Sequence, residues 1–444
     1  MKKFILNNIS RLPIFINKLL LKLNRSPSLI YGQEYANFFK SLQEEEEYDN
    51  EKDLINLINR SIDDVPYYSK YQKISTIKDF ESQFDFIDKD VVSRNFDILK
   101  SKTMNEDDYE IVTTGGTGGN PLKLLVPRNR YIVELSVMHD MWSRVEFRHH
   151  TRAVIRNRKL EESQEYIINP ITKEVIFDGF RLNSNYFQKI YDIIKFFNIQ
   201  YIHAYPSTAY EFSRFIYDNK LDISFVKAFL SGSENVYKYQ KEFITKKLGV
   251  LFYNWYGHSE KLVLGGYCSY SDNYHIEPRY GYFELIDREG NPINTPGRVG
   301  EIVGTTLNNY GMPLIRYKTD DYAEYVGNYC EKCGRRVTLI KNIEGRRNGN
   351  KIYGADGSTV TTTALNFHDD LYMALAGLQY IQNEKGVLDV LIIKNNYFTE
   401  NHEKRLKDHF KSKFSLGTRV NIKYVDKLIK KPNGKFVELL STVK

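Results

Sequence analysis

The chain has 444 residues, enough for two or three domains. Its 41% hydrophobic and 27% charged residues are typical of a globular protein and exclude disordered, collagen-like and disulfide-scaffold classes. Six of the seven net positive charges belong to residues 1–33, which contain no Asp or Glu. The rest of the chain is nearly neutral, so we expect no nucleic-acid partner.

The first predicted element is a basic amphipathic helix over residues 1–25, interrupted at Pro13. It has two interpretations: a helix packed on the body of the protein, or a reversible anchor at an anionic membrane surface. No apolar run reaches the roughly 18 residues of a membrane-spanning helix. No secretory cleavage site follows, and three cysteines fit a reducing compartment. We expect a cytoplasmic protein, and the anchor interpretation adds peripheral contact at the inner face of the membrane through residues 1–25.

Helices and strands then alternate through the middle of the chain. Hydrophobic spacing predicts helices from about residue 130 and near 187–197, 208–217 and 237–248, the last ended by Gly249. Short apolar runs predict strands at 201–205, 225–230 and 250–255. This alternation indicates parallel βαβ units, in which ligands bind beyond the carboxyl ends of the strands.

After about residue 280 the pattern changes to short strands and turns. Strands are expected at 282–286, 301–306 and 313–317, which together predict a β-rich subdomain. A smaller α+β unit is expected after Gly345. Its predicted helices lie near 362–376 and 401–414, and its predicted strands near 377–381, 387–394 and 419–425.

Each of the three middle strands leads directly into a short polar cluster. The clusters are Tyr205-Pro206-Ser207, Ser231-Gly232-Ser233-Glu234 and Tyr256-Gly257-His258-Ser259-Glu260. Because parallel strands end at the same edge of a sheet, we expect these clusters to lie side by side on one rim. A Gly/Thr-rich segment, residues 113–122, precedes the helix near residue 130 and can present backbone N–H groups to an anion.

These segments resemble motifs of the adenylate-forming ligases, and most closely the branch of phenylacetate–CoA ligases and CapK-like capsule-biosynthesis proteins. The resemblance covers the chain from about residue 110 to its end. Its motifs are the Gly/Thr loop, Ser231–Glu234, Trp255–Glu260, Arg316–Asp321, Glu344-Gly345-Arg346 and Lys431–Lys435. It implies an α/β fold with parallel βαβ sheets. After a basic segment (1–33), a large adenylation domain (34–345) with a β-rich subdomain is followed by a small mobile α+β domain (346–444).

The resemblance implies that ATP activates a small carboxylic acid as an acyl-adenylate. Lys435, Glu260 and Arg346 would be the catalytic residues, with Glu260 holding Mg²⁺. Asp321 would accept hydrogen bonds from the ribose hydroxyls and is preferred by position over Asp320, where the family usually has glycine. Tyr256 would stack on adenine. The remaining implied nucleotide contacts are Thr113, Thr114, Gly115, Gly116, Thr117, Gly118, Gly232, Ser233, Glu234, Gly257 and Ser259.

The acceptor of the acyl group stays open at this point. It is CoA, a carrier-protein thiol or an amine such as an amino sugar, and the last two suit a capsule or surface-polysaccharide pathway. Residues 347–350 depart from the acidic hinge of the family. An alternative is therefore a non-catalytic nucleotide-binding scaffold recruited to the membrane surface.

Cysteine and histidine spacing predicts a metal site. Cys330 and Cys333 form a CxxC pair, which is half of a tetrahedral zinc site. By resemblance to family members with a Cys…His pair after the Glu260 motif, Cys268 and His275 would complete it. The alternative is a reduced, metal-free pair. Of the other histidines, His203 is expected in the core or the wall of a pocket, and His149 at the surface.

Overall fold

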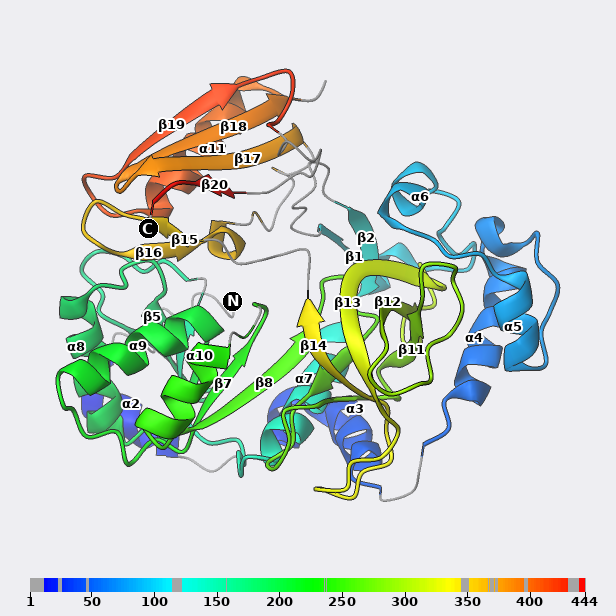
Figure 1. Cartoon of the computed structure of the whole chain (residues 1–444), viewed down its shortest axis with the longest axis horizontal. Coiled ribbons are helices and arrows are strands. Elements are labelled where there is room, and N and C mark those ends of the chain that lie inside the picture. Colours follow the sequence, from blue (N-terminus) through cyan, green and yellow to red (C-terminus); the bar gives the residue numbers. More distant parts are fainter. Residues whose placement is uncertain are drawn as a thin grey trace.

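A computed structural model gives the arrangement of the chain (Figure 1). It describes residues 12–22, 26–44, 48–113, 122–156, 158–234, 236, 238–344, 351–365, 367, 371, 374–394, 398–429 and 439–443. None of the helices in these ranges is long and apolar enough to cross a membrane.

The N-terminal part is helical as far as a β-hairpin. Its helices are α2 (Ile14–Lys22), α3 (Pro27–Leu42), α4 (Glu51–Asp64), α5 (Ile77–Gln83) and α6 (Lys89–Arg94). Pro13 precedes α2, which fits its missing N–H and its fixed φ. The hairpin consists of β1 (Tyr109–Thr113) and β2 (Lys123–Pro127), and α7 (Arg130–Ser143) follows it.

A twelve-stranded sheet forms the centre of the molecule, in the order β11-β12-β13-β14-β10-β9-β8-β7-β6-β3-β5-β4. Strands β3, β5, β6, β7 and β8 are parallel to their neighbours within this set, which confirms the predicted βαβ units. This half contains β3 (Arg152–Arg156), β4 (Ile167–Asn169), β5 (Glu174–Asp178), α8 (Ser184–Phe197), β6 (Tyr201–Ala204), α9 (Pro206–Asp218), β7 (Ala228–Gly232), α10 (Lys238–Glu242) and β8 (Leu251–Gly257).

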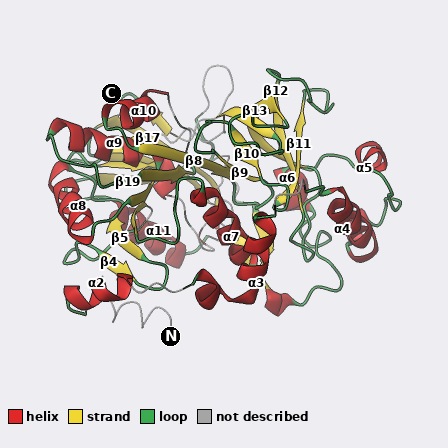
Figure 2. Ribbon diagram, turned by 90° about the horizontal axis from the view of Figure 1, so that it is seen from below, coloured by secondary structure: helices red, strands yellow, loops and turns green. Residues whose placement is uncertain are grey.

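The other half of the sheet is antiparallel, which agrees with the predicted β-rich subdomain. It contains β9 (Leu264–Gly266), β10 (Tyr274–Ile276), β11 (Gly281–Ile286), β12 (Val299–Thr306), β13 (Tyr317–Gly327) and β14 (Leu339–Glu344). One apolar core lies between this half, α7 and the N-terminal helices; a second lies between β3–β8 and α8 and α9. Figure 2 shows α8, α9 and α10 grouped on one side of the sheet, and α7 beside α3.

The C-terminal unit (residues 351–443) has its own sheet and core. A hairpin of β15 (Lys351–Tyr353) and β16 (Thr359–Thr361) precedes a four-stranded sheet ordered β19-β18-β17-β20. Its members are β17 (Leu375–Glu384), β18 (Val387–Lys394), α11 (Glu400–Lys413), β19 (Arg419–Tyr424) and β20 (Leu439–Ser441). In Figure 1 this unit lies above α8 and α9, with the hairpin between them.

Four sequence predictions need correction. A helix over 362–376 is wrong: the described residues form a 3-10 turn at Thr362–Leu365, and β17 begins at Leu375, whose apolar side chain joins the C-terminal core. The strand predicted at 313–317 begins only at Tyr317, because Pro313 has no N–H and Arg316 has a left-handed φ of 52°. The helix predicted at 237–248 changes to a π-helical turn at Phe243–Lys247. His149 is buried, not exposed.

Candidate functional site

The three polar clusters meet on one rim, as the parallel register requires. Strands β6, β7 and β8 are neighbours, so the residues that follow them emerge together. The backbone N–H of Ser207 donates to Oε2 of Glu234 at 3.3 Å and joins the first cluster to the second. Burial raises the pKa of Glu234, while its contacts with Ser207 and Thr361 act in the opposite direction.

The second cluster needs glycine at its centre. A Cβ atom on Gly232 would lie 2.5 Å from the ring of Trp255, which β8 places beside it. The chain then turns through Ser233, whose φ is 70°. Gly257 has a similar constraint, since its Cβ would lie 2.8 Å from a methyl carbon of Leu264. Both glycines therefore let the rim approach the neighbouring strand closely.

Tyr256 and Asp321 join the third cluster to strand β13. The Tyr256 hydroxyl donates to Oδ2 of Asp321 at 2.8 Å. Burial and the negative charge of Asp321 raise the pKa of Tyr256 well above its ordinary value. Asp320 has a different environment, because its N–H donates to Glu301 and its φ is 61°, a conformation that glycine adopts most easily. This conformation would suit glycine at position 320 better than a residue with a side chain, and Asp321 lies beside Tyr256 at the rim.

Glu260 is held at the rim by a histidine that sequence reasoning did not use. The N–H of Val263 donates to Nε2 of His258 at 3.2 Å, so Nδ1 carries the proton and donates to Oε2 of Glu260 at 3.1 Å. Glu260 also lies close to Tyr317 of β13, and burial together with the charge of Glu260 raises the pKa of Tyr317. The Glu260 side chain is only 13% exposed. An ionised carboxylate in this position is the donor type that Mg²⁺ prefers.

Several predicted site residues lie outside the described part of the chain. They are Thr114, Gly115, Gly116, Thr117, Gly118, Arg346 and Lys435, together with the segment 347–350. Thr113 is described and is the last residue of β1. Ser259 lies half-buried in the turn between His258 and Glu260.

The four predicted zinc ligands come together, although they are up to 65 residues apart in the sequence. The ligand atoms of Cys268, His275, Cys330 and Cys333 all lie within 4.8 Å of one another. The pairing of β10 with both β9 and β14 brings the two halves of the cluster together. Nδ1 of His275 faces the carbonyl of Asn273 at 2.9 Å, so the proton resides on Nδ1, and Nε2, 3.3 Å from Sγ of Cys333, is the atom that would bind a metal ion. This donor set fits one tetrahedral zinc ion.

The C-terminal unit contacts the rim through the β15–β16 hairpin. Lys351 forms an ion pair with Glu211 of α9, and the Thr359 hydroxyl donates to the other oxygen of Glu211 at 2.8 Å. Helix α11 makes a second contact with the large domain: Lys413 lies 4.2 Å from the ring centroid of Phe180, which follows β5, and burial lowers the pKa of Lys413 to about 8. The hairpin is the first described element after the predicted hinge.

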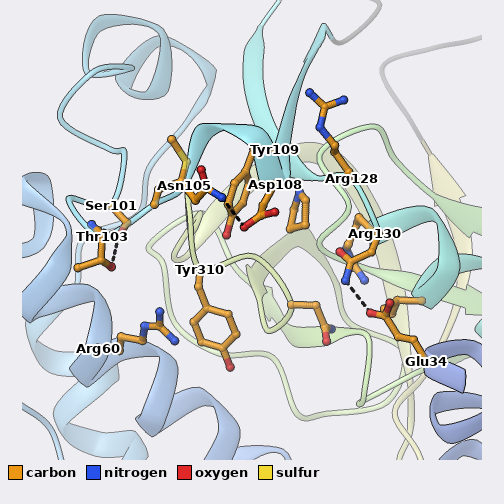
Figure 3. Close-up of a pocket in the computed structure, with 15 residues that line it drawn as sticks. Glu34, Arg60, Ser101, Thr103, Asn105, Asp108, Tyr109, Arg128, Arg130 and Tyr310 are labelled. Atoms are coloured by element: carbon orange, nitrogen blue, oxygen red, sulfur yellow. Dashed lines mark hydrogen bonds between the residues drawn. The ribbon is translucent and has the colours of Figure 1, made fainter.

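A polar cavity of about 620 Å³ lies elsewhere, below the β1–β2 hairpin (Figure 3). Its polar groups contact one another: Asn129 donates to Glu34 at 2.6 Å, and the Arg60 guanidinium lies 4.6 Å from the ring centroid of Tyr310. None of the rim residues lines it. The sequence patterns did not predict this cavity.

Comparison with known proteins agrees with the resemblance of the motifs. Residues 352–441 match the family model of the CapK C-terminal domain. The chain is 22% identical to Protein CapK of Staphylococcus aureus over 372 residues, which cover 80% of this chain and 78% of that protein.

Solved structures show the same fold. One is a 2-hydroxyisobutyryl-CoA ligase in complex with 2-HIB-AMP and CoA, with a TM-score of 0.58, 13% identity, and coverage of 95% of this chain and 94% of that chain. Another is this ligase in its postadenylation state, with a TM-score of 0.55, 14% identity and 88% coverage of each chain. These findings confirm the predicted resemblance to adenylate-forming ligases and to CapK-like proteins.

Proposed function

Because the chain carries a CapK C-terminal domain and has the fold of the adenylate-forming ligases, we propose that it is an ATP-dependent carboxylic acid ligase. A carboxylate oxygen of the acid forms a bond to the α-phosphorus of ATP. The bond from that phosphorus to the bridging oxygen breaks, and pyrophosphate leaves. The acyl group then passes to an acceptor, and AMP leaves. The observation that supports this most strongly is the joining of Tyr256, Asp321 and Glu260 on one rim.

The rim residues have distinct roles in this proposal. Tyr256 provides a ring for adenine, and its hydrogen bond holds Asp321 in place to accept hydrogen bonds from the ribose hydroxyls. Glu260, oriented by His258, would hold Mg²⁺, which supplies positive charge to the phosphate oxygens. Lys435 and Arg346 would place cations where the acyl and phosphoryl oxygens gain negative charge. Residues 113–118 would donate backbone N–H groups to the phosphates.

Pyrophosphate exchange into ATP, measured with a panel of acids, tests the first half-reaction. The wild type should exchange with at least one acid, and Lys435→Ala should lose about 100-fold or more in rate, the range for loss of one group that stabilises transition-state charge. Equal inactivity of both proteins, with nucleotide binding retained, would favour the alternative of a non-catalytic scaffold. Absence of both exchange and nucleotide binding would contradict both.

The acceptor is proposed to be CoA, a carrier thiol or an amine such as an amino sugar. The thiol or amine attacks the acyl carbon, loses its proton, and displaces AMP. The similarity to Protein CapK supports a place in capsule or surface-polysaccharide biosynthesis. Release of AMP with each acceptor in turn, after exchange has identified the acid, distinguishes the three.

We also propose a structural zinc ion held by Cys268, His275, Cys330 and Cys333. The convergence of three sulfur atoms and one imidazole nitrogen supports it. Cys268, Cys330 and Cys333 lie in turns between strands of the antiparallel half, His275 lies within β10, and none of the four belongs to a rim cluster. The ion would therefore stabilise the subdomain rather than take part in the reaction.

Membrane contact is the third part of the proposal. Helix α2 packs on the second core through Leu21 and exposes Phe15 and Leu19, which are 69% and 63% exposed. Lys18 and Lys22 lie on the same helix, and residues 1–33 contain no acid. Apolar side chains surrounded by cations suit a peripheral position at an anionic, inner membrane face.

A further inference from the structure

A cluster of hydrogen-bond donors lies where strands β3 and β6 end. The register pairs Val154 with His203, so Arg156, two residues further along β3, lies on the same face of the sheet as His203. The Arg156 guanidinium lies 2.6 Å from Nε2 of His203 and donates to Oγ of Ser233 at 2.9 Å. Arg156 therefore connects His203 with Ser233, which lies in the segment Ser231–Glu234 that the resemblance assigns to nucleotide binding.

The partners of Arg156 determine the proton position on His203. A guanidinium has only donors, so Nε2 of His203 must accept, and the proton lies on Nδ1. Burial and the nearby Arg156 charge lower the pKa of His203, which keeps the ring neutral. Among the described residues, Nδ1 of His203 and Nε1 of Trp142 have no hydrogen-bond acceptor. The two rings are in contact, with centroids 5.5 Å apart, and Trp255 contacts both.

A second arginine on the same strand provides a comparison. Arg152 pairs with the carboxylate of Glu174 at 2.5 Å. For Arg156, the described contacts are neutral groups only: His203, Ser233 and the ring of Tyr205, 4.6 Å from the guanidinium carbon. These groups accept hydrogen bonds from the guanidinium, but none of them carries a negative charge, so the described contacts leave the charge of this half-buried cation without a carboxylate partner. A ligand anion with oxygen acceptors would balance this charge.

We propose that Arg156 is the specificity-determining residue of the acid subsite, and that the acid substrate carries a second carboxylate, which the guanidinium binds. This inference rests on the proposed ligase function and deepens it. One carboxylate of the substrate reacts with ATP at the rim. The other carboxylate would accept hydrogen bonds from the Arg156 guanidinium at the end of β3, beside Ser233 and His203.

Matched acids test the proposal in the exchange reaction. Succinate, glutarate and adipate are each compared with the branched monocarboxylate in which an isopropyl group replaces the second carboxylate. For the wild type, kcat/KM should favour the dicarboxylate by about 10- to 100-fold, the factor of one charge-assisted hydrogen bond. In Arg156→Met the preference should disappear while the KM of ATP stays the same. Arg158→Met, which removes an exposed charge two residues away, should keep the preference.

Calorimetry measures binding of the preferred dicarboxylate in the presence of AMP. Because this measurement requires no turnover, it tests the subsite independently of the proposed ligase activity. Binding to the wild type and to Arg158→Met, but not to Arg156→Met, supports the subsite even if exchange is absent; absent exchange would contradict only the ligase proposal. Three results would overturn the subsite: an unchanged preference in Arg156→Met, binding of the dicarboxylate that does not depend on Arg156, or a raised KM of ATP as the main effect of the substitution.

Discussion

Two neighbouring carboxylates, Asp320 and Asp321, show how much depends on backbone conformation at one residue. The left-handed φ of Asp320 directs its N–H to Glu301, whereas Asp321 reaches the Tyr256 hydroxyl across the rim. The two side chains are the same in chemistry and differ in what they contact. The hydroxyl of Tyr256, the proposed adenine platform, donates to Asp321.

This difference gives a prediction for single substitutions. Asp321→Asn should raise the KM of ATP in the exchange assay by about tenfold or more, because a charge-assisted hydrogen bond to the ribose is replaced by a weaker neutral one. Asp320→Asn is the matched control and should stay within about twofold, since its side chain has no role in the proposed site. Steady-state kinetics at saturating acid measure both. The assignment of the ribose contact fails if Asp320→Asn has the larger effect.

At the scale of elements, strand pairing produces the four-ligand cluster. Cys330 and Cys333 lie in a tight turn, in which the N–H of Gly334 donates to the carbonyl of Cys330 at 2.8 Å. The turn precedes β14, and Cys268 follows β9. Because β10, which contains His275, pairs with both β14 and β9, the turn lies close to Cys268 and His275. The ligands therefore depend on the sheet for their positions, and a bound ion would in turn hold two loops and strand β10 together.

Metal analysis tests this cluster directly. Protein purified without added zinc should contain about one equivalent, and Cys330→Ser should release it and lower the melting temperature. Removing the metal from the wild type with a chelator should lower the melting temperature similarly. Less than about one-tenth of an equivalent in the wild type would contradict the zinc site.

The β15–β16 hairpin is held by Glu211, which bridges Lys351 and Thr359. Replacing it by Gln removes one charge from a half-buried contact, and we expect amide hydrogen exchange across residues 351–361 to accelerate about fivefold. The control is Glu403→Gln, which removes the partner of Lys407 in an exposed pair within α11. That variant should not change exchange in the hairpin. Equal protection in both variants would mean that Glu211 does not hold the hairpin.

At the scale of the whole molecule, the charge is unevenly distributed. Six of seven net charges lie in residues 1–33, and α2 adds exposed Phe15 and Leu19 to this basic end. The rim lies on other elements, and its charged residues, Glu234, Glu260 and Asp321, are acidic. The basic end and the proposed active site are therefore separate features, and one can be changed without the other.

Vesicle binding tests the basic end. The double substitution Phe15→Ser and Leu19→Ser should weaken binding to vesicles with anionic lipid by about tenfold or more, because burying each large apolar side chain contributes about 1.5–3 kcal/mol. Exchange activity should be unchanged. Leu416→Ser, at an 89% exposed leucine of the C-terminal unit, is the control and should bind as the wild type does. Equal binding of both variants and the wild type would contradict the membrane surface.

Local patterns were sufficient for much of the fold. Hydrophobic spacing predicted α8, α9, α11 and the strands β6, β8 and β18, because their periodicity follows from one buried face. The same reasoning failed at 362–376, where apolar residues at helical spacing pack into the C-terminal core without forming that helix. There tertiary burial overrides the local pattern.

The sequence by itself determined the order of the motifs, the parallel βαβ units and the four candidate zinc ligands. The βαβ units and the CxxC pair follow from residue type and spacing, whereas the motifs and the ligands Cys268 and His275 came from the resemblance to the adenylate-forming ligases. Only the tertiary structure decided which side chains meet: Asp321 with Tyr256, His258 with Glu260, and Arg156 with His203. The last pair is 47 residues apart and is joined by the register of β3 and β6. Contacts across parallel strands depend on the register between segments that are distant in sequence, and the local pattern of residues does not predict that register.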